Sequence, residues 1–172
     1  MRVAIEKIEN YNPAAVREFL RRTLLPELEA RNVTGRILVK PNLLGAFAPE
    51  RAVTTHPVVV EQTVRLLQET DREVVLGDSP GGSAPTSEVC EVTGIAGVAR
   101  RCGVPLLDFK QMGVREVTRD GVSLYVTEAL FQYDAIVNLC KLKTHSLMLY
   151  TGAVKNLFGL VPGLKKSLYH RD

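Results

Sequence analysis

The sequence has few aromatic residues and no tryptophan. Aromatic side chains make up 6% of its 172 residues. Proteins that bind single-stranded nucleic acid stack its bases on aromatic rings, so this scarcity argues against that class. No apolar run approaches the ~18 residues of a membrane-spanning helix. The first ten residues carry charges throughout and lack the apolar core of a secretory signal. We therefore expect a soluble, cytoplasmic protein that binds neither nucleic acid nor membranes.

Cysteine is also scarce, and the three cysteines lie far apart, at Cys90, Cys102 and Cys140. No CxxC pair occurs, which excludes a zinc ribbon and an iron–sulfur binding run within this sequence. An odd number of scattered cysteines is typical of reduced thiols in a cytosolic protein. We predict no metal site and assign no cofactor.

Three common motifs are absent as well. No G-x-S-x-G elbow indicates a serine hydrolase. The glycine-rich stretch 77–82, GDSPGG, is neither a GxGxxG fingerprint nor a phosphate loop, because no Gly-Lys-Ser/Thr follows it. Backbone N–H groups in such a stretch, including those of Gly81 and Gly82, could still hold an anion. An ordinary tight turn between a strand and a helix is the alternative.

The pattern that is present alternates short apolar runs with amphipathic ones. Apolar runs of strand length occupy residues 1–8, 35–40, 73–78, 104–109 and 135–139, and helical patterns start near 13, 57 and 86. Asp120-Gly121 separates two further strand-like runs and predicts an antiparallel hairpin. The sequence therefore predicts one α/β domain with three layers. Its mixed sheet has a mainly parallel centre with helices on both faces, and the hairpin is an excursion from it.

Charge is unevenly distributed along the chain. Of the 22 lysines and arginines, six lie in residues 140–172, which contain one acidic residue, Asp172. The rest of the chain is slightly acidic. We therefore treat residues 140–172, which are rich in glycine and lysine, as a segment that binds an anionic ligand or a partner, and not as a basic coat for nucleic acid.

Polar residues follow three of the predicted strands, where ligands of parallel α/β sheets bind. The candidate ligand-binding residues are Lys40 and Asn42 after one strand, Gly81 and Gly82 after the next, Lys141 and Lys143 after the last, and Lys155 and Asn156 in a short glycine-bracketed helix. In extended backbone, Lys141 and Lys143 point to the same side and repel each other unless an anion offsets their charge.

Two residues are candidates for catalysis, Asp78 and His145. Asp78 could act as a base or bind a metal, and pairing with a lysine is the simpler alternative. His145 lies among the lysines and could transfer protons. His56, like His145, is a candidate for proton transfer or metal binding. Because His56 directly precedes Pro57, capping of the helix that follows is its simpler role.

The motifs VKPNLL (39–44), TTHP (54–57), LGDSPGG (76–82) and KLKTHSLMLYTGAVKNLFGLVPGLKK (141–166) resemble the domain of unknown function 362 family. The resemblance spans most of the chain. It implies that the chain is the amino-terminal part of a longer domain. Some members are fused to ferredoxin-like iron–sulfur modules, but no such module is encoded here. The family gives no substrate.

Two functions follow from these observations. The first is binding of an anionic small molecule, bearing phosphate or carboxylate, at the carboxyl ends of the strands, by a protein that could be an enzyme. The alternative is a redox-partner or assembly module whose basic face docks an acidic iron–sulfur protein. A shortened domain would also expose an apolar face, over which it could form a homodimer.

Overall fold

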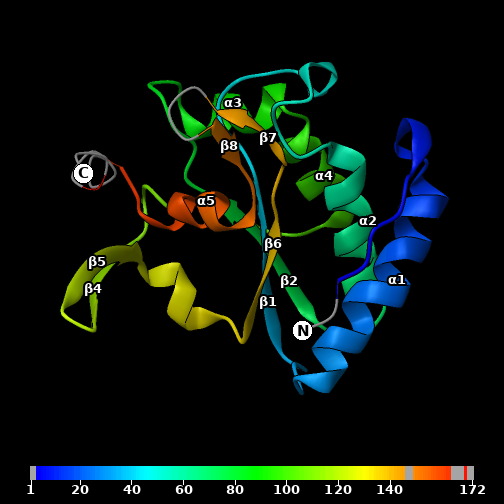
Figure 1. Ribbon diagram of the computed structural model, residues 1–172, viewed down its shortest axis with the longest axis horizontal. Helices are drawn as coiled ribbons and strands as arrows, with labels where there is room; N and C mark the ends of the chain where they lie inside the picture. Colours follow the sequence, from blue (N-terminus) through cyan, green and yellow to red (C-terminus); the bar gives the residue numbers. More distant parts are fainter. Residues whose placement is uncertain (1–2, 146–148, 164–168, 170–172) are drawn as a thin grey trace.

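The computed structural model describes residues 3–145, 149–163 and 169. Figure 1 shows a twisted sheet between two layers of helices. The helices are η1 (Glu9–Tyr11), α1 (Pro13–Ala30), η2 (Pro49–Arg51), α2 (Pro57–Gln68), α3 (Thr86–Val92), α4 (Ile95–Cys102), η3 (Glu128–Gln132), α5 (Ala153–Leu157) and η4 (Phe158–Leu160). The strands are β1 (Arg36–Pro41), β2 (Glu73–Asp78), β3 (Leu106–Asp108), β4 (Val114–Arg119), β5 (Val122–Thr127), β6 (Ala135–Leu139), β7 (Lys143–His145) and β8 (Leu149–Thr151).

The central sheet has the strand order β3-β2-β1-β6, and all of its strand pairs are parallel. The α/β fold with a mainly parallel centre is therefore confirmed. The chain builds outward from β1 to β3 and then returns to the other side of β1 with β6. The strand order thus reverses between β1 and β6, which is the position where open α/β sheets form a ligand-binding crevice.

Two apolar clusters hold the layers together. On one face, α2 and α4 pack on β1 and β2 through a cluster that includes Val39, Val64 and Leu76, while α1 packs against α2. On the other face, Leu38, Phe109, Ala129 and Leu160 form a smaller cluster beneath the short helices η3 and η4. Helices cover both faces, as the sequence predicts, but the second face is covered only by short ones (Figure 1).

The hairpin predicted around Asp120-Gly121 is β4–β5, and it projects from the sheet at the left of Figure 1. Both turn residues have positive φ angles, of 51° and 79°. This is the backbone of a type I′ turn, and aspartate and glycine adopt it most readily.

Three expected boundaries are wrong. Residues 3–8 form no strand, because no neighbouring strand is there to pair with them. Val3 and Ile5 are accordingly 74% and 93% exposed. The helix expected to start near residue 86 is divided into α3 and α4 at Gly94, whose φ is 76°. The strand expected over 104–109 shortens to β3. Throughout the described ranges, no helix combines the length and apolarity needed to cross a membrane.

The sheet can pack closely on Phe109 only because residue 77 is glycine. A Cβ atom at Gly77 would lie 2.8 Å from Phe109 Cζ and 3.3 Å from Leu38 Cδ1. We expect Gly77→Ala to lower the free energy of unfolding by about 1–3 kcal/mol, the usual cost of overpacking a core. Urea denaturation measures this change.

The matched control is Gly97→Ala in α4. An added Cβ there meets only Arg101 Nη1, at 3.1 Å, and this is the far end of a flexible side chain. Alanine also favours the helix by about 0.5–1 kcal/mol over glycine, so stability should be kept or raised. Equal losses in the free energy of unfolding of Gly77→Ala and Gly97→Ala would contradict overpacking against Phe109 as the cause.

Candidate functional site

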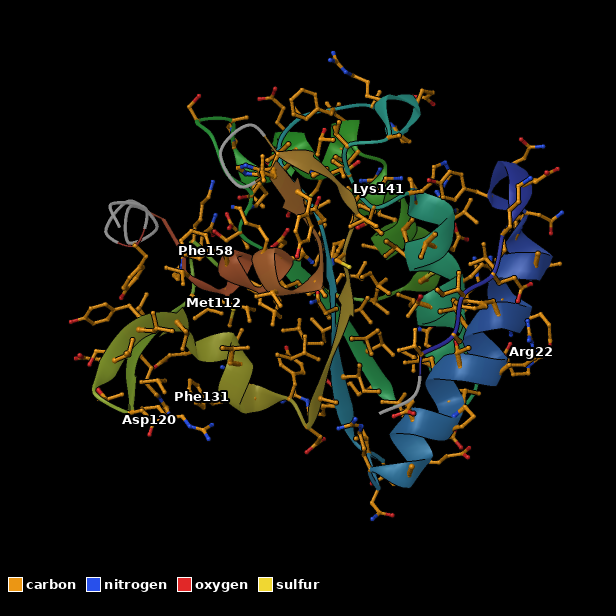
Figure 2. All side chains as sticks on the ribbon, in the orientation of Figure 1. Arg22, Met112, Asp120, Phe131, Lys141 and Phe158 are labelled. Carbon is orange, nitrogen blue, oxygen red and sulfur yellow. The ribbon has the colours of Figure 1, made fainter. Side chains whose placement is uncertain are left out.

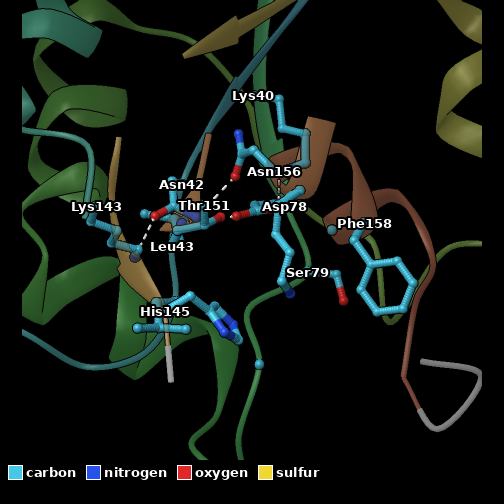
Figure 3. Close-up of a pocket in the computed structure, with 14 residues that line it drawn as sticks. Lys40, Asn42, Leu43, Asp78, Ser79, Lys143, His145, Thr151, Asn156 and Phe158 are labelled. Atoms are coloured by element: carbon cyan, nitrogen blue, oxygen red, sulfur yellow. Dashed lines mark hydrogen bonds and ion pairs between the residues drawn. The ribbon is translucent and has the colours of Figure 1, made fainter. Parts of the chain in front are cut away.

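A cavity of about 300 Å³ lies at the carboxyl ends of β1 and β2, roofed by β7, β8 and α5. Figure 3 shows its side chains converging from these elements. Eight of the ten residues predicted for binding or catalysis line it. They are Lys40, Asn42, Asp78, Gly81, Lys143, His145, Lys155 and Asn156. The parallel sheet explains this convergence, because it brings the ends of separate strands to one edge.

A buried ion pair forms the floor of the cavity. Lys40 Nζ lies 2.7 Å from Asp78 Oδ1, and the two side chains are 0% and 4% exposed. Leu43 N donates to Asp78 Oδ2 at 3.0 Å, and Lys40 Nζ donates to Pro41 O at 3.2 Å. Oδ1 makes the ionic contact but accepts no well-aligned hydrogen bond from any described group. Of the roles proposed for Asp78, pairing with a lysine is thus the one observed.

Gly159 closes directly over this ion pair. A Cβ atom at this position would lie 2.7 Å from Lys40 Nζ and would also clash with Asp78 Oδ1. The absence of a side chain therefore allows the segment after α5 to seal the pair from one side, and this seal helps to keep Lys40 fully buried.

A chain of asparagine amides connects the strand ends to α5. Asn42 Nδ2 donates to Asn156 Oδ1 at 2.9 Å. Asn156 Nδ2 in turn donates to Asn138 Oδ1 at 2.7 Å and to Pro41 O at 3.3 Å. Asn138 Nδ2 donates to Ala153 O at 2.9 Å, which fixes the first turn of α5. These bonds orient Asn42 and Asn156, the two predicted amide ligands.

Lys143 reaches into the same network from β7. Its ammonium donates to Asn42 Oδ1 at 2.8 Å and to Val53 O. Both acceptors are neutral, and the side chain is half-buried. Burial lowers the pKa of Lys143 below its usual value, and the nearby charges of Lys141 and Lys155 lower it further.

His145 and Lys155 complete the polar wall. His145 is two residues after Lys143 in β7, so both side chains leave the same face of that strand. Across the hairpin, Lys143 is paired in register with Thr151, a buried residue of β8 that also lines the cavity. Lys155 projects from α5, and its Nζ lies 5.5 Å from the centre of the Phe158 ring.

Two predicted ligand-binding residues, Gly82 and Lys141, do not line this cavity. Lys141 precedes β7, and its Nζ donates to Tyr11 Oη at 2.9 Å. Lys141 and Lys143 therefore do not line the cavity together, although the charge of Lys141 adds to the effect of burial in lowering the pKa of Lys143. Figure 2 shows Lys141 on the α2 side of the sheet and Phe158 on the opposite side. Lys165 and Lys166, in the predicted basic segment, lie outside the described residues.

His56 has the simpler of its two predicted roles. Its Nδ1 accepts a hydrogen bond from Val58 N at 3.3 Å and caps α2. Its ring stacks on Tyr11, with centroids 3.8 Å apart. Burial, and then the charge of Lys141, lowers the pKa of His56.

Sequence reasoning missed several contributors to the site, namely Asn138, Thr151, Phe158, Gly159 and Ser79. Only Asn138 carried a usable signal, as a lone amide within the apolar strand 135–139. The others depend on the β7–β8 hairpin and on the turn after α5, and no short-range pattern predicts either.

The described residues contain no cluster of three or more histidine, cysteine or acidic side chains that could hold a metal ion. The three cysteines are free thiols. Burial raises the pKa of Cys90 to about 12, so this thiol is not a nucleophile near neutral pH.

Comparison with known proteins identifies a family and a named relative. The model of the family described as Domain of unknown function (DUF362) matches residues 37–172. The thylakoid-associated protein sll1697 of Synechocystis sp. (strain ATCC 27184 / PCC 6803 / Kazusa) is 37% identical over 140 residues, which are 80% of this chain and 42% of the relative. The chain therefore spans less than half the length of that relative. No solved structure matches.

The buried pair makes a testable contribution to stability. Removing one partner of a buried ion pair typically costs 3–5 kcal/mol, because the other charge is left without compensation. We expect Lys40→Met and Asp78→Asn each to lower the free energy of unfolding by about that much. The double variant should lose less than the sum of the two, since it leaves no charge behind.

Urea denaturation of the four proteins measures this coupling. Lys7→Met with Glu9→Gln is the control cycle, because this pair is 85% and 73% exposed and should contribute almost nothing. Strict additivity in the Lys40–Asp78 cycle would contradict the assignment of a coupled buried pair.

Proposed function

This chain belongs to the DUF362 family, and we propose that it binds an anionic small molecule, bearing phosphate or carboxylate, at the carboxyl ends of its parallel strands. The observation that carries the proposal is Lys143. It is a half-buried cation on the cavity wall, and no described carboxylate forms an ion pair with it. A bound anion would offset the charge that the protein leaves uncompensated.

The charges around the cavity support this proposal. Lys40 and Asp78 cancel each other, since they form a close ion pair. Lys143 and Lys155 then remain as cations on the wall. Burial lowers the pKa of Lys143, and repulsion by the nearby charges of Lys141 and Lys155 lowers it further. An anion of one or two negative charges would match them.

The topology supports the same position. The cavity takes residues from the end of β1, Lys40 and Asn42, and from the chain that follows β6, Lys143 and His145. These two strands flank the reversal of strand order, where open α/β sheets bind ligands. A cavity of about 300 Å³ is at the small end of ligand sites. We therefore propose a small organic or inorganic anion, with Asp78 and His145 as candidate catalytic groups.

The alternative function, docking of an acidic iron–sulfur protein on the basic segment, rests on the family resemblance and on the charge of residues 140–172. The cytoplasmic location is likewise a prediction. The name of the relative suggests association with thylakoid membranes as a second location to test. Fractionation of cells at low and high salt makes this test. Release from membranes by salt would indicate peripheral binding through charge.

Sulfate is a suitable probe of the anion site because its charge does not change near neutral pH. At 100-fold over its dissociation constant, a ligand stabilises the folded state by about 2.7 kcal/mol, which a thermal-shift assay detects. We expect Lys143→Gln to weaken sulfate binding about 10- to 100-fold, the usual value of a hydrogen bond to a charged group. Lys155→Gln should weaken it as well.

Lys7→Gln is the matched control, because Lys7 is 85% exposed and does not line the cavity. It should bind sulfate as the unchanged protein does. Equal sulfate affinity in Lys143→Gln and Lys7→Gln, with both variants folded by circular dichroism, would overturn the proposed site.

The pKa of Lys143 gives a second test. The ammonium form binds the anion, and the pKa of this group is lowered. Sulfate affinity should therefore fall as pH rises through that lowered pKa, at a lower pH than an ordinary lysine would cause. Lys143→Arg, whose guanidinium stays charged, should remove the fall. Calorimetric titration between about pH 6 and about pH 10, a range below the usual lysine pKa of about 10.4, measures this fall. A flat profile in the unchanged protein would exclude Lys143.

A further inference from the structure

The amine of Lys143 has two hydrogen-bond acceptors, and both are neutral, whereas Lys40 contacts the carboxylate of Asp78. Asn42 Oδ1 and Val53 O each accept one N–H from it. A lysine ammonium has three hydrogens, whereas the neutral amine has two hydrogens and one lone pair. If the neutral amine keeps donating one hydrogen to each of these two acceptors, its lone pair occupies the remaining tetrahedral direction of the nitrogen. Since Lys143 lines the cavity, a ligand there can meet this direction.

The surroundings of Lys143 favour the neutral amine more than those of Lys40 do. Lys40 is held as a cation by Asp78 at 2.7 Å. Lys143 has only neutral acceptors among its described hydrogen-bond partners, and it is half-buried near two other cations. These are the conditions under which lysines act as nucleophiles, namely desolvation and a neighbouring positive charge. The lowered pKa of Lys143 agrees with this geometry.

We propose that Lys143 is a nucleophilic amine that forms an imine with a small carbonyl compound bearing a carboxylate, of the 2-oxo acid class. This inference rests on the proposed function, because it takes the anion of that site to be the carboxylate of the substrate. Lys155, the other unpaired cation of the described cavity wall, would hold that carboxylate. The small volume of the cavity suits a short acid.

The step balances with the groups that this site supplies. The neutral amine of Lys143 attacks the carbonyl carbon, so that a C–N bond forms and the carbonyl oxygen takes up a proton. The resulting hydroxyl group then takes a second proton and leaves as water, and a protonated imine remains. In total, the ammonium loses two protons, which leave with the oxygen. His145, on the same face of β7, is placed to carry these protons in turn.

Reductive trapping tests the proposal directly. The protein is incubated with pyruvate and sodium borohydride, which reduces an imine to a stable secondary amine, and the modified lysine is located by peptide mass mapping. We expect modification at Lys143 to exceed that at the exposed Lys7 by about tenfold or more, because only the cavity holds the carboxylate of pyruvate beside an amine. Sulfate, as a competing anion, should reduce it.

Two variants separate this proposal from the proposed function. Lys143→Arg keeps a cation at the site but cannot form an imine, so it should retain the sulfate-induced thermal shift and lose the adduct. Lys155→Gln keeps the amine but lacks the partner of the carboxylate. It should slow trapping of pyruvate much more than trapping of acetone, a ketone without a carboxylate.

Each outcome decides one of the two proposals. Selective trapping at Lys143 that Lys143→Arg abolishes supports the imine. A sulfate-induced shift together with an unmodified Lys143, or with labelling no higher than at Lys7, overturns the imine and leaves the anion site standing. Absence of both the shift and the adduct in the folded protein overturns both proposals.

Discussion

The buried ion pair between Lys40 and Asp78 is the constraint on which the site depends. A lysine with no exposed surface is tolerated only when its charge is compensated, and Asp78 provides that compensation at 2.7 Å. The pair ties the end of β1 to the end of β2. Leu43 N donates to the same carboxylate, at Oδ2, so the chain that follows β1 is also held to Asp78. Residue 159 must then be glycine, because the segment after α5 closes on the pair. Three separate parts of the sequence are thereby held at one point.

The lysines of this region show how burial assigns different roles to one residue type. Lys40 is paired and sealed, and its charge is part of the structure. Lys141 donates to the Tyr11 hydroxyl and does not line the cavity. Lys143 lies between these extremes, half-buried and bonded to neutral oxygens. A cation in that position is the one most affected by the arrival of an anion, and the one most able to lose its proton.

Much of the fold follows from local patterns, and part of the site does too. Alternating apolar runs and amphipathic helices predict the parallel sheet, because strand and helix periods are local properties. Asp120-Gly121 predicts its hairpin for the same reason. Lys40, Asp78 and Lys143 follow from the rule that strand ends meet at one edge. The direction of Lys141 does not follow, since it is set by Tyr11, which is remote in sequence. The strand prediction for residues 3–8 is wrong for a similar reason, because alternation alone does not supply a neighbouring strand.

The asparagine chain explains why the cavity can be both polar and well ordered. Polar groups at a partly buried site are costly unless each is bonded, and networks that satisfy every member hold their side chains in one arrangement. Asn42 is bonded to Lys143 on one side and to Asn156 on the other, and Asn156 continues to Asn138 in β6. The position of the Lys143 amine is thus fixed by β1, β6 and α5 together. A ligand that meets this amine encounters a group whose orientation was determined by folding, so that little further ordering is required when it binds.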